Sequence, residues 1–256
     1  MVAFKGVLLD LGGVVYVGTT PIPGALDALA RLRTAKVPLR FLTNTTRTSF
    51  RKLRADLKRM GVMVAQDELF TPARAARHII EHEGLAPHLL IHPALRSDFS
   101  GLSGGTREAV IIGDAGDRFT YSALNAAFRA LDRGAQFLAL ANNRSFRDAD
   151  GGLSLDAGPF VAALSFASGR EPRVLGKPAS AFFRAAIASL SCEPQECVMI
   201  GDDVEADIAG AMAVGAAGVL VRTGKYQAGA EAKISPPPSA VVDDLSAAAE
   251  WVLKQG

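Results

Sequence analysis

Polar side chains in this sequence gather where apolar, strand-like runs end. The run Val7–Leu9 closes on a carboxylate and the run 37–42 closes on a hydroxyl and an amide. Two later runs close on an ammonium and on a pair of carboxylates. The residues are Asp10, Thr43 with Asn44, Lys177, and Asp202 with Asp203, followed by Asp207. Taken singly, each has an ordinary alternative as a turn, a helix cap or a surface lysine.

Together these side chains have the chemistry of phosphoryl transfer. In a doubly wound parallel sheet the carboxyl ends of the strands lie along one edge, so groups far apart in sequence can converge there. A carboxylate at a strand end can act as a nucleophile, while the hydroxyl, amide and ammonium can hold phosphoryl oxygens. Oxygen-only ligation favours Mg²⁺, which also binds phosphate. The joint occurrence of four such strand ends favours this site over four unrelated alternatives.

One further aspartate has nearly the same sequence context as Asp202. The stretch Ile111–Asp114 is similar to Met199–Asp202, but no Lys-Pro strand end precedes it and it continues through Gly116. We therefore interpret Asp114 as a loop or capping residue and not as a ligand.

The elements that must position these groups alternate between strands and helices, which predicts an α/β fold with a parallel sheet. Apolar periodicity indicates helices over 25–32, 48–60, 180–190 and 204–214, and strands over 7–9, 37–42, 197–200 and 218–222. A strand from residue 173 ends at Lys177. We expect a Rossmann-like doubly wound sheet in a core domain of residues 1–72 and 173–256.

Residues 73–172 form an α/β pattern of their own and are predicted to be an inserted domain. Helices are expected over 73–83, 121–133 and 159–167, and strands over 88–92, 109–112 and 136–141. The segment 142–158 is polar, charged and rich in glycine, so we expect a loop there.

The bulk composition is that of an ordinary globular protein. Of the 256 residues, 49% are hydrophobic and 21% charged, and 28 basic against 26 acidic residues give a net charge of +2. This balance gives no indication of nucleic-acid binding. Without a signal pattern or a long apolar run we expect no membrane association and a cytoplasmic location. Cys192 and Cys197 match no common zinc site and are expected to be reduced thiols.

The four motifs resemble those of the haloacid dehalogenase superfamily. The similarity covers nearly the whole chain and is greatest to class IIA, in which a large α/β cap is inserted between the second and third motifs. The residues that carry the resemblance are the strand end at Asp10, Phe41–Thr46, Leu175–Pro178, Val198–Asp203 and Val221–Tyr226. The resemblance implies a Mg²⁺-dependent phosphatase that acts on a small phosphorylated substrate.

The resemblance also implies a role for each matching residue. Asp10 would attack phosphorus and form an aspartyl-phosphate, and Lys177 would pair with Asp10 and with the transferring phosphate. Mg²⁺ would be held by Asp10, the backbone carbonyl of Gly12 and Asp202. Asp207 would lie in the outer shell of the metal, with Asp203 as a second candidate. Gly12, Thr43, Asn44 and Lys177 would bind the phosphoryl group.

Gly12 departs from the pattern of most phosphatases of this superfamily, which have a general-acid aspartate two residues after the nucleophile. A missing general acid typically costs about 10²–10⁴-fold in rate, and less when the leaving group is a stable anion. We therefore expect slow hydrolysis biased towards good leaving groups, with pyrophosphate, a phosphoamino acid or a phosphate ester as the substrate. A catalytically weak or inactive binding or regulatory protein is the alternative.

The polar stretch 142–150 of the inserted domain is the best candidate to select the substrate. Asn143 and Arg144 are predicted to contact it, and Arg144 and Arg147 can both meet anionic groups. Because relatives often dimerise through the cap, the resemblance also suggests a homodimer.

Overall fold

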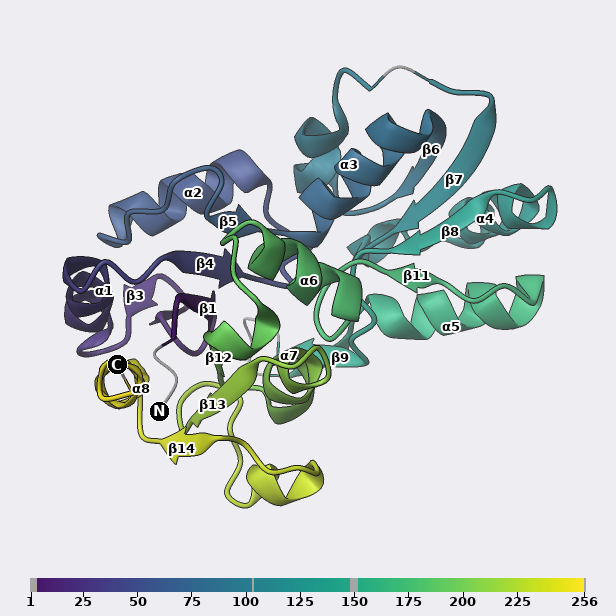
Figure 1. Cartoon of the computed structure of the whole chain (residues 1–256). Helices are drawn as coiled ribbons and strands as arrows, with labels where there is room; N and C mark the ends of the chain where they lie inside the picture. Colours follow the sequence, from purple (N-terminus) through teal and green to yellow (C-terminus); the bar gives the residue numbers. More distant parts are fainter. Residues whose placement is uncertain (1–3, 103, 148–151, 256) are drawn as a thin grey trace. The chain divides into compact units, whose positions relative to one another are not determined.

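The computed structural model describes residues 4–102, 104–147 and 152–255, which contacts group into two compact units (Figure 1). The first unit comprises Met1–Thr43, Arg54–Phe70 and Lys177–Gly256, and the second comprises Asn44–Leu53 and Thr71–Gly176. The sequence placed residues 44–53 in the core domain, whereas their contacts lie with the second unit. The exact domain boundaries stay a prediction.

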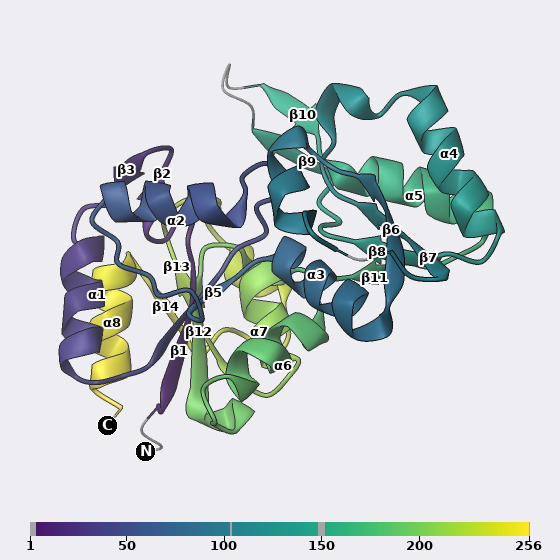
Figure 2. The ribbon, with the colours of Figure 1, turned by 90° about the horizontal axis from the view of Figure 1, so that it is seen from above.

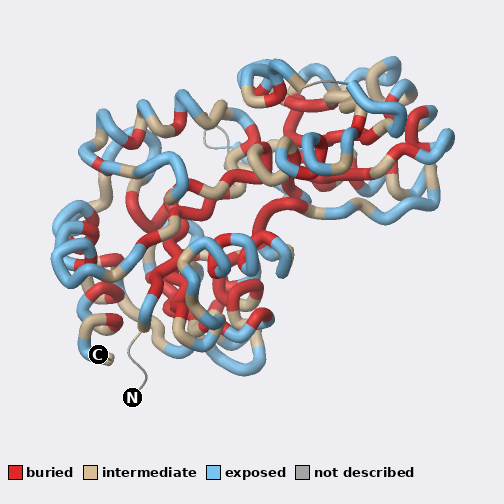
Figure 3. The backbone as a smooth tube through the Cα atoms, turned by 45° about the horizontal axis from the view of Figure 1, so that its top comes forward, coloured by how far each residue is buried: buried red, intermediate tan, exposed pale blue. Residues whose placement is uncertain are grey.

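The first unit is built on a six-stranded parallel sheet, as predicted. Its strand order is β14-β13-β12-β1-β4-β5. The strands are β1 (Gly6–Asp10), β4 (Leu39–Leu42), β5 (Leu69–Phe70), β12 (Cys197–Gly201), β13 (Ala217–Val221) and β14 (Ala240–Val242). β1 is buried along its whole length (Figure 3), which explains its continuous apolar sequence.

Helices cover both faces of this sheet (Figure 2). α1 (Ala25–Thr34) and α8 (Leu245–Leu253) lie side by side on one face, and α6 (Ser180–Ala188) and the short α7 (Gly210–Met212) lie on the other. α1 presents an apolar stripe to the sheet through Ala25, Ala28, Leu29 and Leu32. The doubly wound α/β architecture expected from the sequence is confirmed.

The second unit has a four-stranded parallel sheet in the order β11-β8-β7-β6. The strands are β6 (Leu85–Leu90), β7 (Arg107–Ile112), β8 (Gln136–Ala139) and β11 (Arg173–Val174), and the helices are α3 (Pro72–Glu83), α4 (Tyr121–Asp132) and α5 (Ala157–Ser168). Alternate residues of β7 face opposite sides. Ala109 and Ile111 join the core under α3, whereas Val110 and Ile112 join the core under α4 and α5.

Local periodicity was wrong about the sheet to which one strand belongs. The sequence assigned the strand at residue 173 to the core domain, but β11 pairs with β8 of the second unit, with Arg173 opposite Leu138. Apolar pattern identifies a strand but carries no information about its partner. Lys177 therefore follows a strand of the second unit and lies in the loop before α6.

Several short elements escaped the sequence reasoning. β2 (Tyr16–Val17) pairs with β3 (Thr20–Pro21), and β9 (Ser145–Arg147) pairs antiparallel with β10 (Leu153–Leu155) in the segment expected to be a loop. α2 (Phe50–Arg59) begins in the second unit and ends in the first. Residues 148–150 of the predicted substrate segment lie outside the described residues.

Two further expectations can be compared with the fold. Cys192 and Cys197 are both free thiols. Burial raises the pKa of the Cys197 thiol to about 12, so this thiol stays protonated at neutral pH. Across the described part of the chain, the helices are too short or too polar for any of them to span a bilayer.

Candidate active site

Asp10 occupies the carboxyl end of the central strand, where neighbouring strands bring the other predicted groups. β1 pairs in parallel with β4, with Asp10 opposite Leu42, and with β12, with Leu9 opposite Ile200. Thr43 and Asp202 therefore follow at the same edge of the sheet. Both side chains are buried, as is Asp10. The structure places these three residues at one edge of the sheet, and their roles in a reaction stay predictions.

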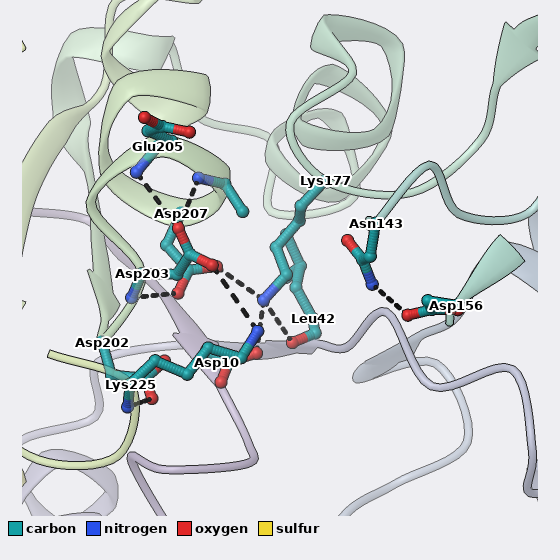
Figure 4. Close-up of polar contacts among 11 residues, drawn as sticks. Asp10, Leu42, Asn143, Asp156, Lys177, Asp202, Asp203, Glu205, Asp207 and Lys225 are labelled. Carbon is teal, nitrogen blue, oxygen red and sulfur yellow. Dashed lines mark hydrogen bonds and ion pairs between the residues drawn. The ribbon is translucent and has the colours of Figure 1, made fainter. Parts of the chain in front are cut away.

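Lys177 joins the group as its buried ammonium (Figure 4). Its Nζ forms an ion pair with Asp10, lies 2.6 Å from Oδ1 of Asp207 and donates to the Leu42 carbonyl at 3.4 Å. Burial alone would lower the pKa of Lys177, but the charges of Asp10 and Asp207 outweigh it and hold the pKa above its usual value. Lys177 is therefore a permanent cation within the site.

Asp202 is held by the backbone of the segment that follows β13. Its Oδ2 accepts a hydrogen bond from the backbone N–H of Lys225 at 2.7 Å. Burial, followed by the negative charge of Asp10, raises the pKa of Asp202 to about 6. Because its surroundings disfavour the ionised form, a cation bound beside Asp202 would stabilise the carboxylate.

Asp207 comes from a π-helix over Val204–Ala209, where a regular helix was expected. The Asp203 side chain caps this helix by accepting from the N–H groups of Glu205 and Ala206 at 3.2 and 3.0 Å. Oδ2 of Asp207 accepts from the Asp203 N–H at 3.2 Å, while Oδ1 makes the ion pair with Lys177. Burial raises the pKa of Asp207 to about 7, against the opposing charge of Lys177.

The three carboxylates fit a divalent cation. Oxygen atoms of Asp10, Asp202 and Asp207 all lie within 4.8 Å of one another, and all three residues are buried. Three ionised carboxylates outnumber the buried ammonium of Lys177, and their mutual repulsion contributes to the raised pKa values of Asp202 and Asp207. An all-oxygen site with this charge suits Mg²⁺ better than a transition metal.

Gly12 lies two residues after Asp10, and the space beside its Cα could accommodate a side chain. A Cβ at this position would meet no described atom within 4 Å, and its φ is not in the left-handed region. The backbone therefore does not require glycine here. Gly201 differs, because a Cβ there would overlap the side chain of Asp207. Glycine is thus needed at position 201 to admit Asp207, but not at position 12.

The predicted phosphate- and substrate-binding residues are divided between the two units. Thr43 belongs to the first unit, and Asn44, Asn143 and Arg144 belong to the second. Asn143 donates a hydrogen bond at 3.0 Å to Asp156, the N-terminal cap of α5 (Figure 4), and Arg144 is exposed. The roles of all four residues towards substrate stay predictions.

Asp114 is absent from the carboxylate group and has a different partner. It is buried in the second unit, where Oδ2 lies 2.6 Å from Nε of Arg47 and Oδ1 accepts from the Gly116 N–H at 3.0 Å. The Arg47 guanidinium also lies over the Phe146 ring, 4.5 Å from its centroid. The sequence context that matches Asp202 therefore serves an internal ion pair.

We predict that replacing Arg47 lowers the free energy of unfolding more than replacing Asp114 does. Arg47→Gln leaves a buried carboxylate without its cation and should destabilise the protein by about 3 kcal/mol. Asp114→Asn keeps an acceptor for Gly116 and leaves Arg47 able to reach water, so it should cost about 1 kcal/mol. Urea unfolding followed by circular dichroism measures both. Equal losses would contradict the assignment.

Sequence reasoning missed one part of the site, the segment after β13. Lys225 contributes its backbone N–H to Asp202, and a backbone group has no residue-type signature. The only signal was the stretch Val221–Tyr226, which was noted for its resemblance and not for any chemistry.

Two family models match this chain. A model described as haloacid dehalogenase-like hydrolase matches residues 7–104, and one described as HAD-hydrolase-like matches residues 174–248. These ranges contain Asp10, Thr43, Lys177, Asp202 and Asp207, the residues around which the site is built.

Individual proteins show the same relationship over nearly the full length. The human haloacid dehalogenase-like hydrolase domain-containing protein 2 is 42% identical over 98% of this chain and 97% of its own. The human phospholysine phosphohistidine inorganic pyrophosphate phosphatase is 36% identical over 98% and 94%. Among solved structures, the glycerol phosphate phosphatase from Mycobacterium tuberculosis in complex with magnesium has a TM-score of 0.82 at 28% identity, over 94% of this chain and 75% of that one. The chain therefore belongs to the haloacid dehalogenase-like hydrolases, and it is a hydrolase of the phosphatase type.

Proposed function

We propose that this hydrolase is a Mg²⁺-dependent phosphatase that works through an aspartyl-phosphate on Asp10. The observation that carries the proposal is the buried group of Asp10, Asp202 and Asp207 around Lys177 at one edge of the sheet. Asp10 is the nucleophile because it ends the central strand and pairs directly with the ammonium. Asp10, the Gly12 carbonyl and Asp202 would hold Mg²⁺, with Asp207 behind them.

The reaction follows from the charges of these residues. An oxygen of Asp10 forms a bond to phosphorus while the bond from phosphorus to the leaving-group oxygen breaks. Lys177 reduces the repulsion between the Asp10 carboxylate and the phosphoryl oxygens, and Thr43 donates a hydrogen bond to one of them. When bound, Mg²⁺ neutralises charge on these oxygens and polarises the phosphoryl group. Water then forms a bond to phosphorus while the bond from phosphorus to Asp10 breaks. The proton that the water loses leaves with the released phosphate, and the Asp10 carboxylate is restored.

The leaving group departs without a neighbouring carboxylic acid, because position 12 is glycine. A leaving group that is stable as an anion needs no proton as it departs, so pyrophosphate and activated esters should react faster than alkyl esters. The substrate class that we propose is therefore a small phosphorylated molecule with a good leaving group. The human pyrophosphate phosphatase named above gives independent support for including pyrophosphate.

Gly12 also supports a second candidate function. A protein that keeps the metal site but lacks the general acid could bind phosphorylated molecules and regulate other proteins without useful turnover. Fluoroberyllate, which mimics a phosphoryl group on a carboxylate, should modify Asp10 in either case. Only the enzyme would also release phosphate from a substrate.

A substrate panel tests the proposed function. We expect phosphate release from pyrophosphate and p-nitrophenyl phosphate in the presence of Mg²⁺, and slower release from a phosphoamino acid and from an alkyl phosphate. Removal of the metal with a chelator should lower the rate at least about 10²-fold, and added Mg²⁺ should restore it. An equal rate with and without the metal would sink the proposal. The suggested homodimer stays a prediction.

A further inference from the structure

The segment Thr223–Lys225, which follows β13, contacts two parts of the proposed metal site at once. The Thr223 hydroxyl donates a hydrogen bond to the carbonyl of Gly13, in the turn that follows Asp10. The Lys225 N–H donates to Oδ2 of Asp202 at 2.7 Å. Both contacts lie within the first unit. Neither the Thr223 side chain nor its contact has a role in the reaction described above.

The residue between these two donors is in equally close contact with the site. Gly224 has φ +58°, and a Cβ there would overlap Oδ2 of Asp202 and lie 2.6 Å from the Cα of Gly13. Gly13 has φ +86°, and a Cβ there would overlap the same oxygen and lie 2.9 Å from the Cα of Gly224. The carboxylate of Asp202 is therefore enclosed between two glycine backbones, an approach that side chains would prevent.

The contacts of Thr223–Lys225 with Gly13 and Asp202 lie beyond the end of the pairing between β1 and β12. The pairing of β1 with β12 ends at Leu9 and Ile200, one residue before Asp10 and two before Asp202. Beyond that point the ladder no longer fixes the spacing between the turn after Asp10 and the Asp202 carboxylate. The Thr223 hydrogen bond joins that turn to the same segment that holds Asp202.

From these contacts we infer that Thr223 is a positioning residue for the divalent cation. By tying Gly13 to the segment that holds Asp202, it sets the spacing between the predicted metal ligands on the two strands and hence the affinity for Mg²⁺. Residues that orient metal ligands without touching the metal typically change affinity about 10–100-fold when they are removed. The inference rests on the proposed function, since it assumes the cation site at Asp10 and Asp202.

Two substitutions at one position separate the hydroxyl from the rest of the side chain. Thr223→Val keeps the shape but lacks the donor, whereas Thr223→Ser keeps the donor and loses a methyl group. Binding of Mn²⁺ measured by electron paramagnetic resonance, and of Mg²⁺ by calorimetry, gives a readout that does not depend on turnover. We expect Thr223→Val to weaken the affinity for both cations about tenfold or more. The affinities of Thr223→Ser should stay within about threefold of those of the wild type. Thermal unfolding of the metal-free proteins should be nearly the same.

The outcomes that overturn the inference are distinct from failure of the proposed function. Wild-type affinity in the Val variant, or an equal loss in Val and Ser, would show that the hydroxyl does not position the site. If the Val variant does not fold, Thr223→Ala provides the same comparison with Ser. If the wild type binds neither cation, the proposed metal site fails and the inference with it. Normal wild-type binding together with unchanged variants overturns the inference alone.

Discussion

Asp10→Asn should reduce phosphate release by on the order of 10⁴-fold or more, because the neutral amide cannot attack phosphorus. The substitution keeps the size of the side chain, and Asp207 still pairs with the buried Lys177. The fold should therefore survive, and the effect should appear in kcat rather than in the circular dichroism spectrum. Phosphate release from p-nitrophenyl phosphate at saturating Mg²⁺ measures it.

Asp27→Asn provides the matched control for this prediction. Asp27 is an exposed aspartate in the first turn of α1, outside the group of Asp10, Asp202 and Asp207, so the same chemical change can be made there. It should leave turnover unchanged. Comparable activity in Asp10→Asn and the wild type would mean that another group is the nucleophile. Loss of the fluoroberyllate adduct in Asp10→Asn would confirm that the modified residue is Asp10.

Gly12→Asp should increase turnover of alkyl phosphate esters by about 10²–10⁴-fold, since it supplies the missing proton donor. The structure admits the change, because a Cβ at position 12 meets no described atom within 4 Å and φ is compatible with any residue. The gain should fall below about tenfold for p-nitrophenyl phosphate, whose leaving group is stable without a proton. Steady-state kinetics with both substrates measures the difference.

Gly12→Asn has nearly the same shape as the Asp variant but cannot transfer a proton. It should show no gain with either substrate. An equal gain in Asp and Asn variants would mean that packing or backbone stiffness limits the wild type, not proton transfer. A gain in neither would show that the slow step lies elsewhere.

The parts of the site that could be predicted from sequence are those that end apolar strands. Asp10 ends β1 and Asp202 follows β12, two strands that are buried at every residue, so their apolar runs are continuous. Thr43 follows β4, whose apolar run is interrupted by Arg40 alone. Parallel pairing then brings these ends to one edge without further information. Lys177 was predicted from the same pattern, although its strand belongs to the other sheet. The pattern found the residue without giving the reason for its position.

The remaining parts depend on contacts that have no local signature. Asp207 was expected in the outer shell of the metal, and its sequence gives no sign of the π-helix that carries it. The π-helix and the missing Cβ of Gly201 bring its carboxylate close to those of Asp10 and Asp202. Asp114 shares the local sequence context of Asp202 and was set apart by the missing Lys-Pro strand end, but nothing in the sequence indicates its ion pair with Arg47. The short hairpins were missed because two or three residues are too few to show an alternating pattern.

The central position of β1 has a consequence for how this protein is made. Its partner β12 lies about 190 residues further along the chain, as the pairing of Leu9 with Ile200 shows. The strands of the second unit all lie between residues 85 and 174 and can pair as soon as that stretch leaves the ribosome. Until β12 emerges, the edge of β1 that does not pair with β4 has no partner and is open to mispairing and aggregation. The nascent chain thus builds its insertion first, and the carboxylates of Asp10, Asp202 and Asp207 meet only when the last quarter of the chain emerges.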